Sequence, residues 1–327
     1  MTMQELIQAF PSNIEEALEI AGKSTLTNNY STIDNIVICG MGGSGIGGTL
    51  VKGWLFDELK VPVVVVKDYN IPAFVSDRTL VIGSSYSGNT EETLTAIKES
   101  IRKGAKIIGI CSGGQLQQIC EENGYDHIIV PGGNPPRTAL AYSLVQLLYI
   151  FHKIGLVENH LPEIAASYSL LIDAEAEIKN KAQDLARHLH GKVGVLYATT
   201  LYEGAVIRAR QQFNENSKSL CWHHVLPEMN HNELVGWGGG DDRFAVVYFE
   251  NEGINERNKV RADLTLEKIS EKAGVMRIVS KGRTIIERSM YMINVVDWAS
   301  LYLSEMNKVD PIDIAVIDYL KGSLAKI

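Results

Sequence analysis

The chain has 327 residues, and its contents of 45% hydrophobic and 21% charged residues are typical of a globular protein rather than of a disordered chain or a coiled coil. At about 150 residues per domain, this length predicts two domains, each long enough to bury its own core. The formal net charge is −8 and no basic run stands out, so nucleic acid and anionic membrane are poor candidates as partners.

The N-terminal segment and the cysteines indicate where the protein works. The sequence opens MTMQELIQAF, which lacks the basic segment and apolar stretch of a signal peptide. The longest mostly apolar run, residues 139–151, is too short to span a bilayer. The four cysteines are scattered without CxxC spacing, which indicates neither a disulfide framework nor a cysteine-based zinc site. We expect a cytoplasmic protein with no membrane segment.

Short apolar runs alternate with helix-length segments through the first half of the chain. The runs are rich in β-branched residues and lack polar alternation, which predicts strands buried on both faces. Strands that alternate with helices predict a parallel sheet covered by helices. The predicted strands are 35–39, 61–66, 79–83, 106–110 and 127–130, and the predicted helices are 45–57, 90–103, 115–123 and 138–153.

The second half repeats this scheme. Its predicted strands are 192–198, 243–249 and 275–279, and its predicted helical segments are 160–189, 203–218, 255–272, 284–305 and about 313–324. We therefore predict an α/β protein of two tandem αβα domains, each with a mostly parallel sheet, at residues 1–155 and 156–327. No Pro/Gly/Ser-rich linker marks the boundary, so the two domains are expected to pack closely.

A glycine-rich loop, GMGGSGIGG at residues 40–48, follows the first predicted strand. Between a strand and a helix, such a loop turns backbone N–H groups toward an anion at the helix N-terminus. We expect a phosphate cradle at Gly42, Gly43 and Ser44, although a tight turn that needs positive φ is the alternative. The loop also fits the dinucleotide fingerprint GxGxxG, with Asp68 as a ribose-binding acid, but that match alone is weak.

A second loop, SSYSGNTEET at residues 84–93, follows the third predicted strand and opens a helix. Asn89, with Glu92 three residues later, is a plausible helix-capping pattern. Several short hydroxyl side chains beside helix N-terminal amides suit a terminal phosphate monoester, whereas one helix cap needs only one hydroxyl. This second cluster favours a phosphate site over a nicotinamide dinucleotide site.

These two loops together resemble the sugar isomerase (SIS) domain, a flavodoxin-like αβα module that binds phosphosugars. The resemblance maps the phosphate contacts to Ser44, Ser85, Ser87 and Thr90. Four later motifs extend it along nearly the whole chain and resemble the bifunctional phosphoglucose/phosphomannose isomerase family: PPRTAL at 135–140, NEN at 214–216, PEMNHNE at 227–233 and the tail at 310–324. The expected reaction is the interconversion of glucose 6-phosphate, and of mannose 6-phosphate, with fructose 6-phosphate.

The resemblance also implies the residues that carry out this isomerisation. Moving a proton between C1 and C2 needs a base, a stabiliser of the enediolate and help with ring opening. The resemblance assigns the base to Glu215, which by position alone would be an ordinary surface glutamate. Its flanking amides, Asn214 and Asn216, are expected to hold its carboxylate in place.

Three further residues complete the expected site. Arg137 follows a rigid Pro-Pro pair and is expected to neutralise the enediolate. A histidine near neutral pKa can move the protons of ring opening, and the resemblance assigns this role to His231, donated by the neighbouring subunit of a homodimer. Lys321 matches a C-terminal lysine that assists ring opening; without the resemblance it would only compensate a helix dipole.

A metal site is the rival interpretation of the histidines. His223, His224, His231 and Glu233 lie close in sequence, but their spacing is neither HExxH nor HxH. We therefore expect no metal and no cofactor, only a sugar 6-phosphate substrate.

Three other functions remain open: a catalytically silent SIS protein that senses a sugar phosphate, an enzyme of amino sugar phosphates and, less favoured, a nicotinamide-dependent dehydrogenase.

One departure of this sequence from the family pattern bears on substrate specificity. In the dual-specificity family a threonine near the C-terminal lysine makes room for the mannose epimer, and glucose-specific relatives have glutamine there. Residues 309–321 contain neither, so the use of glucose 6-phosphate is expected more firmly than the use of mannose 6-phosphate.

Overall fold

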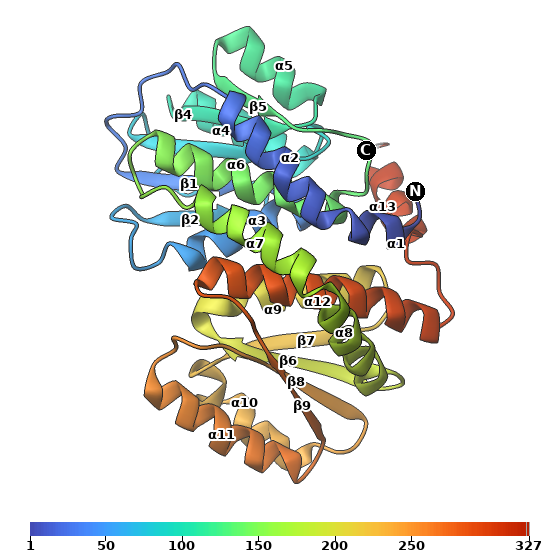
Figure 1. The fold of residues 1–327 in the computed structure, drawn as a ribbon. Helices are drawn as coiled ribbons and strands as arrows, with labels where there is room; N and C mark the ends of the chain where they lie inside the picture. Colours follow the sequence, from blue (N-terminus) through green and yellow to red (C-terminus); the bar gives the residue numbers. More distant parts are fainter. Residues whose placement is uncertain (325, 327) are drawn as a thin grey trace.

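The computed structural model describes residues 1–324 and 326 and contains two parallel β-sheets with helices between and outside them (Figure 1). The strands are β1 (Asn35–Cys39), β2 (Val63–Val66), β3 (Thr79–Ser84), β4 (Lys106–Cys111), β5 (Asp126–Ile129), β6 (Val193–Thr199), β7 (Cys221–Leu226), β8 (Phe244–Glu250) and β9 (Gly274–Val279). The α-helices are α1 (Met3–Gln8), α2 (Phe10–Lys23), α3 (Gly42–Trp54), α4 (Glu91–Arg102), α5 (Gly114–Asn123), α6 (Leu140–Lys153), α7 (Leu161–Asp173), α8 (Glu175–Leu189), α9 (Glu203–Glu215), α10 (Glu233–Gly236), α11 (Glu256–Ser270), α12 (Ile285–Met306) and α13 (Ala315–Leu324). Short 3-10 helices are η1 (Pro136–Thr138), η2 (Thr200–Tyr202), η3 (Glu228–His231) and η4 (Trp237–Gly239).

The first sheet has the strand order β2-β1-β3-β4-β5, and every pairing in it is parallel. Successive side chains of its central strands point alternately into two hydrophobic cores, one on each face of the sheet. Ile36 and Ile38 face the helices α2, α3 and α6, whereas Val37 and Cys39 face α4 and α5. Burial on both faces explains why these strands have no polar alternation in sequence.

The second sheet has the order β7-β6-β8-β9 and is also parallel throughout. Leu196 and Val247 face the interior helices α8, α9 and α12, whereas Val195 and Val246 pack toward α11 on the outer face. The chain therefore has the predicted fold class, an α/β protein with two mostly parallel sheets, each covered by helices.

One layer of helices lies between the two sheets and belongs to both (Figure 1). The largest apolar core runs without a break from Ile38 on the first sheet through Leu147 of α6 and Val296 of α12 to Val247 on the second sheet. Across this layer the Trp54 indole of α3 donates a hydrogen bond to the Ser289 hydroxyl of α12 at 2.9 Å. The close packing of the two halves is thus as expected, while the boundary at residues 155 and 156 stays a prediction.

Several elements differ from the sequence expectations. Helix α3 begins at Gly42, inside the glycine loop, instead of at residue 45. The predicted segment 160–189 is two helices, because the chain turns at Ala174. Four further features have no counterpart among the predicted segments: α1, α2, β7 and the short helices between residues 228 and 239.

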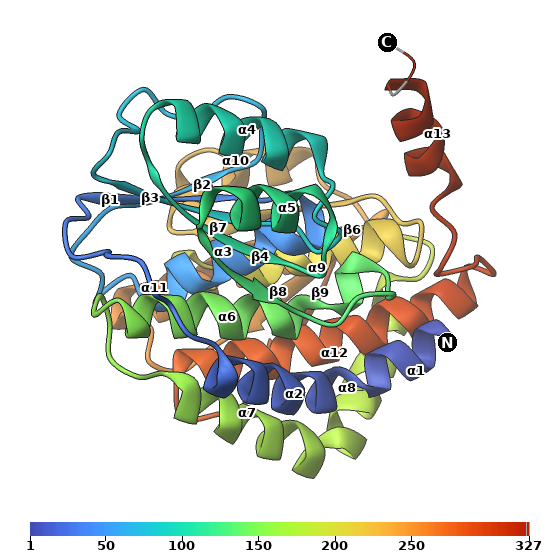
Figure 2. The same ribbon diagram turned by 90° about the horizontal axis from the view of Figure 1, so that it is seen from above.

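The last helix stands apart from the body of the molecule. Figure 2 shows α13 projecting beyond the end of α12 on the side where the N-terminus lies. None of the residues of α13 is buried. Within the part of the chain that the structure describes, no helix is both long enough and apolar enough to cross a membrane.

Candidate active site

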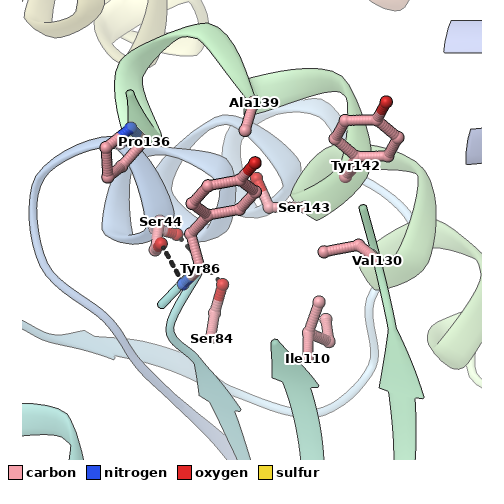
Figure 3. Close-up of a pocket in the computed structure, with 10 residues that line it drawn as sticks. Ser44, Ser84, Tyr86, Ile110, Val130, Pro136, Ala139, Tyr142 and Ser143 are labelled. Atoms are coloured by element: carbon pink, nitrogen blue, oxygen red, sulfur yellow. Dashed lines mark hydrogen bonds between the residues drawn. The ribbon is translucent and has the colours of Figure 1, made fainter. Parts of the chain in front are cut away.

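The glycine loop and the hydroxyl loop meet at the carboxyl ends of the neighbouring strands β1 and β3. Parallel strands bring the loops that follow them to the same edge of a sheet, where ligands bind in open α/β folds. The backbone N–H of Tyr86 donates to Ser44 Oγ at 3.0 Å, and Ser84 Oγ donates to the carbonyl of Ser44 at 3.3 Å (Figure 3). Ser44 therefore joins the two predicted phosphate loops.

The glycines of the first loop have a packing reason of their own. A Cβ on Gly43 would lie 2.8 Å from the carbonyl oxygen of Pro136, and one on Gly45 would lie 2.2 Å from that of Gly40. Gly42 has φ of +49°, a conformation that favours glycine. The number of glycines alone is therefore no measure of phosphate binding. Gly43 instead brings the start of α3 against the segment that carries Arg137.

The hydroxyl loop keeps donors available for an anion. Ser85 Oγ donates to Thr90 Oγ1 at 2.9 Å, and Ser87 Oγ accepts the N–H of Asn89 at 3.2 Å. Among the described residues, the hydroxyl protons of Ser44, Ser87 and Thr90 have no hydrogen-bond acceptor. Three hydroxyl donors next to the first turns of α3 and α4 suit the oxygens of a phosphate.

The N-terminus of α4 differs from the expected capping pattern, and the difference favours a phosphate site there. The N-cap residue is Thr90, not Asn89, and its side chain accepts no capping hydrogen bond. Asn89 Oδ1 instead accepts the N–H of Gln115 at the start of α5. The first amides of α4 thus lack a side-chain acceptor and are free to bind an anion.

Arg137 is almost fully buried and each of its guanidinium nitrogens has a partner. Nη1 contacts Glu215 Oε1 at 2.7 Å, Nε donates to Asn216 Oδ1 at 2.7 Å, and Nη2 donates to the carbonyl of Pro311 at 2.7 Å. Burial lowers the pKa of this guanidinium, and the contact with Glu215 opposes that effect. The structure thus fixes a cation at the edge of the phosphate loops.

Glu215 ends α9 and lies against Arg137 with 30% of its side chain exposed. The flanking amides do not hold its carboxylate, contrary to the expectation. Asn214 Oδ1 accepts from the thiol of Cys221, and Asn216 binds Arg137 and the hydroxyl of Ser300. Successive helix residues point about 100° apart, so the neighbours of Glu215 face other partners. Arg137 is the group that positions the carboxylate.

A buried ion pair that was not predicted from the sequence lies behind Arg137. Arg208 Nη2 donates to the carbonyl of Arg137 at 2.6 Å and to both carboxylate oxygens of Asp297 at 3.1 and 3.2 Å. Gln212 Nε2 donates to Asp297 Oδ1 at 2.8 Å. Burial raises the pKa of Asp297, and the hydrogen bonds from Arg208 and Gln212 act against that rise. A single aspartate inside the apolar sequence of α12 was the available signal.

Lys218 fixes the start of the C-terminal tail beside the site. Its ammonium donates to the carbonyls of Glu215, Asp310 and Asp313 at 2.7 to 2.8 Å. Together with the contact between Arg137 and Pro311, these bonds hold the segment that leads to α13 next to Glu215. Lys218 lies three residues beyond the end of α9 with φ of 51°, in the left-handed region. Nothing in the sequence pattern indicated this role.

The structure of one chain does not bring all four predicted catalytic residues together. Arg137 and Glu215 are in contact, but His231 is exposed on η3 and Lys321 is exposed on α13. Within the described residues neither makes a hydrogen bond to Arg137 or Glu215. The roles of His231 and Lys321 therefore stay predictions.

The histidines of β7 do not form a metal site. His223 and His224 are consecutive strand residues, so their side chains point to opposite faces of the sheet. His224 Nδ1 accepts the N–H of Val225, while burial and the nearby Arg210 lower the pKa of His223 to about 4. Across residues 1–324 and 326, no group of three His, Cys, Asp or Glu side chains lies close enough to share one ion.

Two family descriptions match the two halves of the chain. The SIS domain matches residues 30–151, and the bacterial phospho-glucose isomerase C-terminal SIS domain matches residues 178–324. Among solved structures, similar folds include the C-terminal domain of glucosamine-fructose-6-phosphate aminotransferase from Francisella tularensis (TM-score 0.76, 15% identity, 94% of this chain and 96% of that one). Another is tagatose-6-phosphate ketose/aldose isomerase from Escherichia coli (TM-score 0.68, 13% identity, 93% and 92%). At such identities the likeness concerns the fold alone.

Curated relatives are similar over nearly the whole length. One from Caldicellulosiruptor bescii is 39% identical over 99% of both chains, and one from Aquifex aeolicus is 38% identical over 92% of this chain and 93% of its own. Both are named bifunctional phosphoglucose/phosphomannose isomerase. A D-glucosamine-6-phosphate 4-epimerase from Sulfolobus acidocaldarius is 35% identical over 69% of this chain and 71% of its own. With these full-length matches, the chain belongs to the bifunctional phosphoglucose/phosphomannose isomerase family.

Proposed function

We propose that the protein is an aldose–ketose isomerase that interconverts glucose 6-phosphate and mannose 6-phosphate with fructose 6-phosphate. The observation that carries this proposal is the 2.7 Å contact between Arg137 and Glu215 beside two phosphate loops. A sensor of sugar phosphates would need the loops only. A carboxylate held by a buried cation next to them supplies a base and an anion stabiliser, the two groups that an enediolate mechanism needs.

In this mechanism the phosphate loops position the open-chain sugar. The hydroxyls of Ser44, Ser85, Ser87 and Thr90, with the amides at Gly42 and Gly43, bind the terminal phosphate. Glu215 takes the proton from C2 of the aldose and returns it to C1, or the reverse. Negative charge develops on the sugar oxygens during this transfer, and the Arg137 guanidinium neutralises it at low cost because its position is already fixed. No step requires a metal or another cofactor.

His231 and Lys321 are proposed to serve ring opening in a homodimer. Both side chains are exposed in a single chain, which is compatible with His231 entering the site of a second subunit.

The same proposal places the domain boundary between residues 155 and 156. It also places the enzyme in the cytoplasm, which is supported by four cysteines that are all free thiols.

The proposal is tested by a coupled assay of the purified protein on glucose 6-phosphate and mannose 6-phosphate, each with and without EDTA. We expect turnover of both sugars and no loss on chelation. Glucosamine 6-phosphate is included because one relative is named for its epimerisation. Turnover of that amino sugar alone would contradict the proposal, and activity lost to EDTA and restored by zinc would contradict metal independence.

Removal of a phosphate contact should weaken substrate binding. In Ser87→Ala or Thr90→Ala, KM should rise by about fivefold or more while kcat changes less, because phosphate contacts persist from the bound substrate to the transition state. Ser31→Ala, an exposed loop serine whose backbone N–H alone is hydrogen-bonded, is the matched control. An unchanged KM in both variants would remove the phosphate assignment from these residues.

Subunit mixing tests the donation of His231. Glu215→Gln and His231→Ala should each be nearly inactive alone. After subunit exchange half of the dimers are mixed, and each mixed dimer has one site with both defects and one intact site. Activity should then recover toward a quarter of the wild-type value, half of the dimers times half of their sites. Demonstrated exchange with no recovery would mean that His231 serves its own chain.

A further inference from the structure

The last helix, α13, has an apolar face that nothing in its own chain covers. Val316, Tyr319 and Leu320 lie on one face of this helix by their spacing, and their exposed fractions are 81%, 76% and 57%. A helix of ten residues is marginal in water when it stands alone. Exposed apolar groups in such a helix mark an interaction surface.

The root of α13 is fixed although the helix itself is not. Lys218 and Arg137 bind the carbonyls of Asp310, Pro311 and Asp313, and the first turn of α13 lines a pocket with Leu220. From this root the helix leaves the body of the chain, as Figure 2 shows. The partner of its apolar face must therefore reach it from outside, next to Glu215.

A second apolar surface lies at the amino ends of β7 and β8. Trp222, Trp237 and Phe244 line an open pocket together with Glu233, and the Trp222 and Trp237 rings meet the Phe244 ring edge to face at 5.5 and 5.8 Å. Val235, on the same short helix as Glu233, is 82% exposed. Figures 1 and 2 both place α10 well away from α13 of the same chain.

We propose that α13 of one chain packs its apolar face on the pocket of Trp222, Trp237 and Phe244 in a second copy of the protein. A two-fold dimer makes this contact twice, because each copy offers one helix and one pocket. The two surfaces have complementary charges, since the pocket carries the Glu233 carboxylate and the last turn of α13 carries the Lys321 ammonium.

The contact explains why the site of a single chain is incomplete, and it rests on the proposed function of that site. The pocket lies two residues beyond His231, on the segment proposed to enter the neighbouring subunit. Docking of α13 therefore brings the segment that carries His231 of one copy to the helix of the other, whose root lies beside Glu215 and Arg137. One interface completes both sites.

Hydrogen exchange and sedimentation test this contact without any assay of activity. Amides of residues 315–324 should be protected in the dimer and should lose protection on dilution to monomer. Val235→Asp on the pocket side and Leu320→Glu on the helix side should each weaken dimerisation by about tenfold or more and expose the same amides. Both sites are exposed in the chain, so folding should survive either change. Val260→Asp, an exposed valine on α11, is the matched control and should alter neither measurement.

Each other outcome overturns the proposal. Protection of α13 that is independent of concentration would mean that the helix folds onto its own chain. Protection that survives Val235→Asp and Leu320→Glu would place the helix on another surface, and protection that needs a different protein would exclude a second copy as its partner. These results do not depend on catalysis. A dimer with the expected protection but no isomerase activity would refute the proposed function and leave the interface standing.

Discussion

Replacement of Glu215 by glutamine should lower kcat by a factor on the order of 10²–10⁴, the range expected for a lost general base. Glutamine keeps the shape of the side chain and an oxygen that can accept the 2.7 Å hydrogen bond from Arg137, but it cannot take a proton from C2. KM should change little, because the hydroxyls at Ser87 and Thr90 and the buried Arg137 stay in place. Steady-state kinetics on glucose 6-phosphate measures both constants.

The same reaction run with wild-type protein in deuterated water gives an independent measure of proton transfer. Deuterium should appear at C2 of the aldose or C1 of the ketose. The amount of label is reduced where Glu215 returns the abstracted proton to the sugar before that proton exchanges with solvent. Glu256→Gln is the matched control, since among the described residues the Glu256 carboxylate pairs only with Lys259, on the far helix α11. Near-normal turnover of Glu215→Gln would move the base to another carboxylate. Glu233 and Glu228 would be tested next, because they flank His231.

The parts of the fold that the sequence predicted are those whose burial leaves a mark on composition. Strands β1 and β4 lie between helices on both faces, so their sequences are rich in β-branched residues without polar alternation, and β1 has the predicted bounds. Strand β7 escaped notice because it is an edge strand, half-buried, with two histidines and a tryptophan in six residues. Nothing in that composition distinguishes it from a loop.

In the candidate site, too, some residues could be predicted from the local sequence and others could not. Ser44 and Ser85 are found by local spacing, since each lies in a loop between a strand and a helix. The contacts that position Arg137 and Glu215 join distant segments: Arg137 to Pro311, and Lys218 to Asp313. Such pairings depend on how the two sheets share their middle layer of helices, and a single sequence holds no periodic signal for them. The same reason hid the ion pair of Arg208 and Asp297.

That ion pair should control stability more than any exposed charge. Asp297→Asn keeps the shape of the side chain but leaves the almost fully buried Arg208 guanidinium without a counter-ion. Breaking a buried pair in this way typically costs about 3–5 kcal/mol, a factor of more than about 100 in the unfolding equilibrium. Unfolding by guanidinium chloride measures the loss. Asp184→Asn, which breaks only the exposed pair with Arg187, should change little.

The double variant Arg208→Met/Asp297→Leu separates the charge from the packing. Removing both charges leaves no buried ion unpaired, so this protein should be more stable than Asp297→Asn although it is altered at two positions. It should still lose kcat, because Arg208 no longer donates to the carbonyl of Arg137 and the guanidinium beside Glu215 is less firmly placed. Asp297→Glu should be more stable than Asp297→Asn if the carboxylate that pairs with Arg208 is ionised. If Asp297→Asn unfolds like the wild type, the carboxyl that burial pushes toward protonation is neutral in the native state, and Arg208 is held by its bond to Arg137 alone.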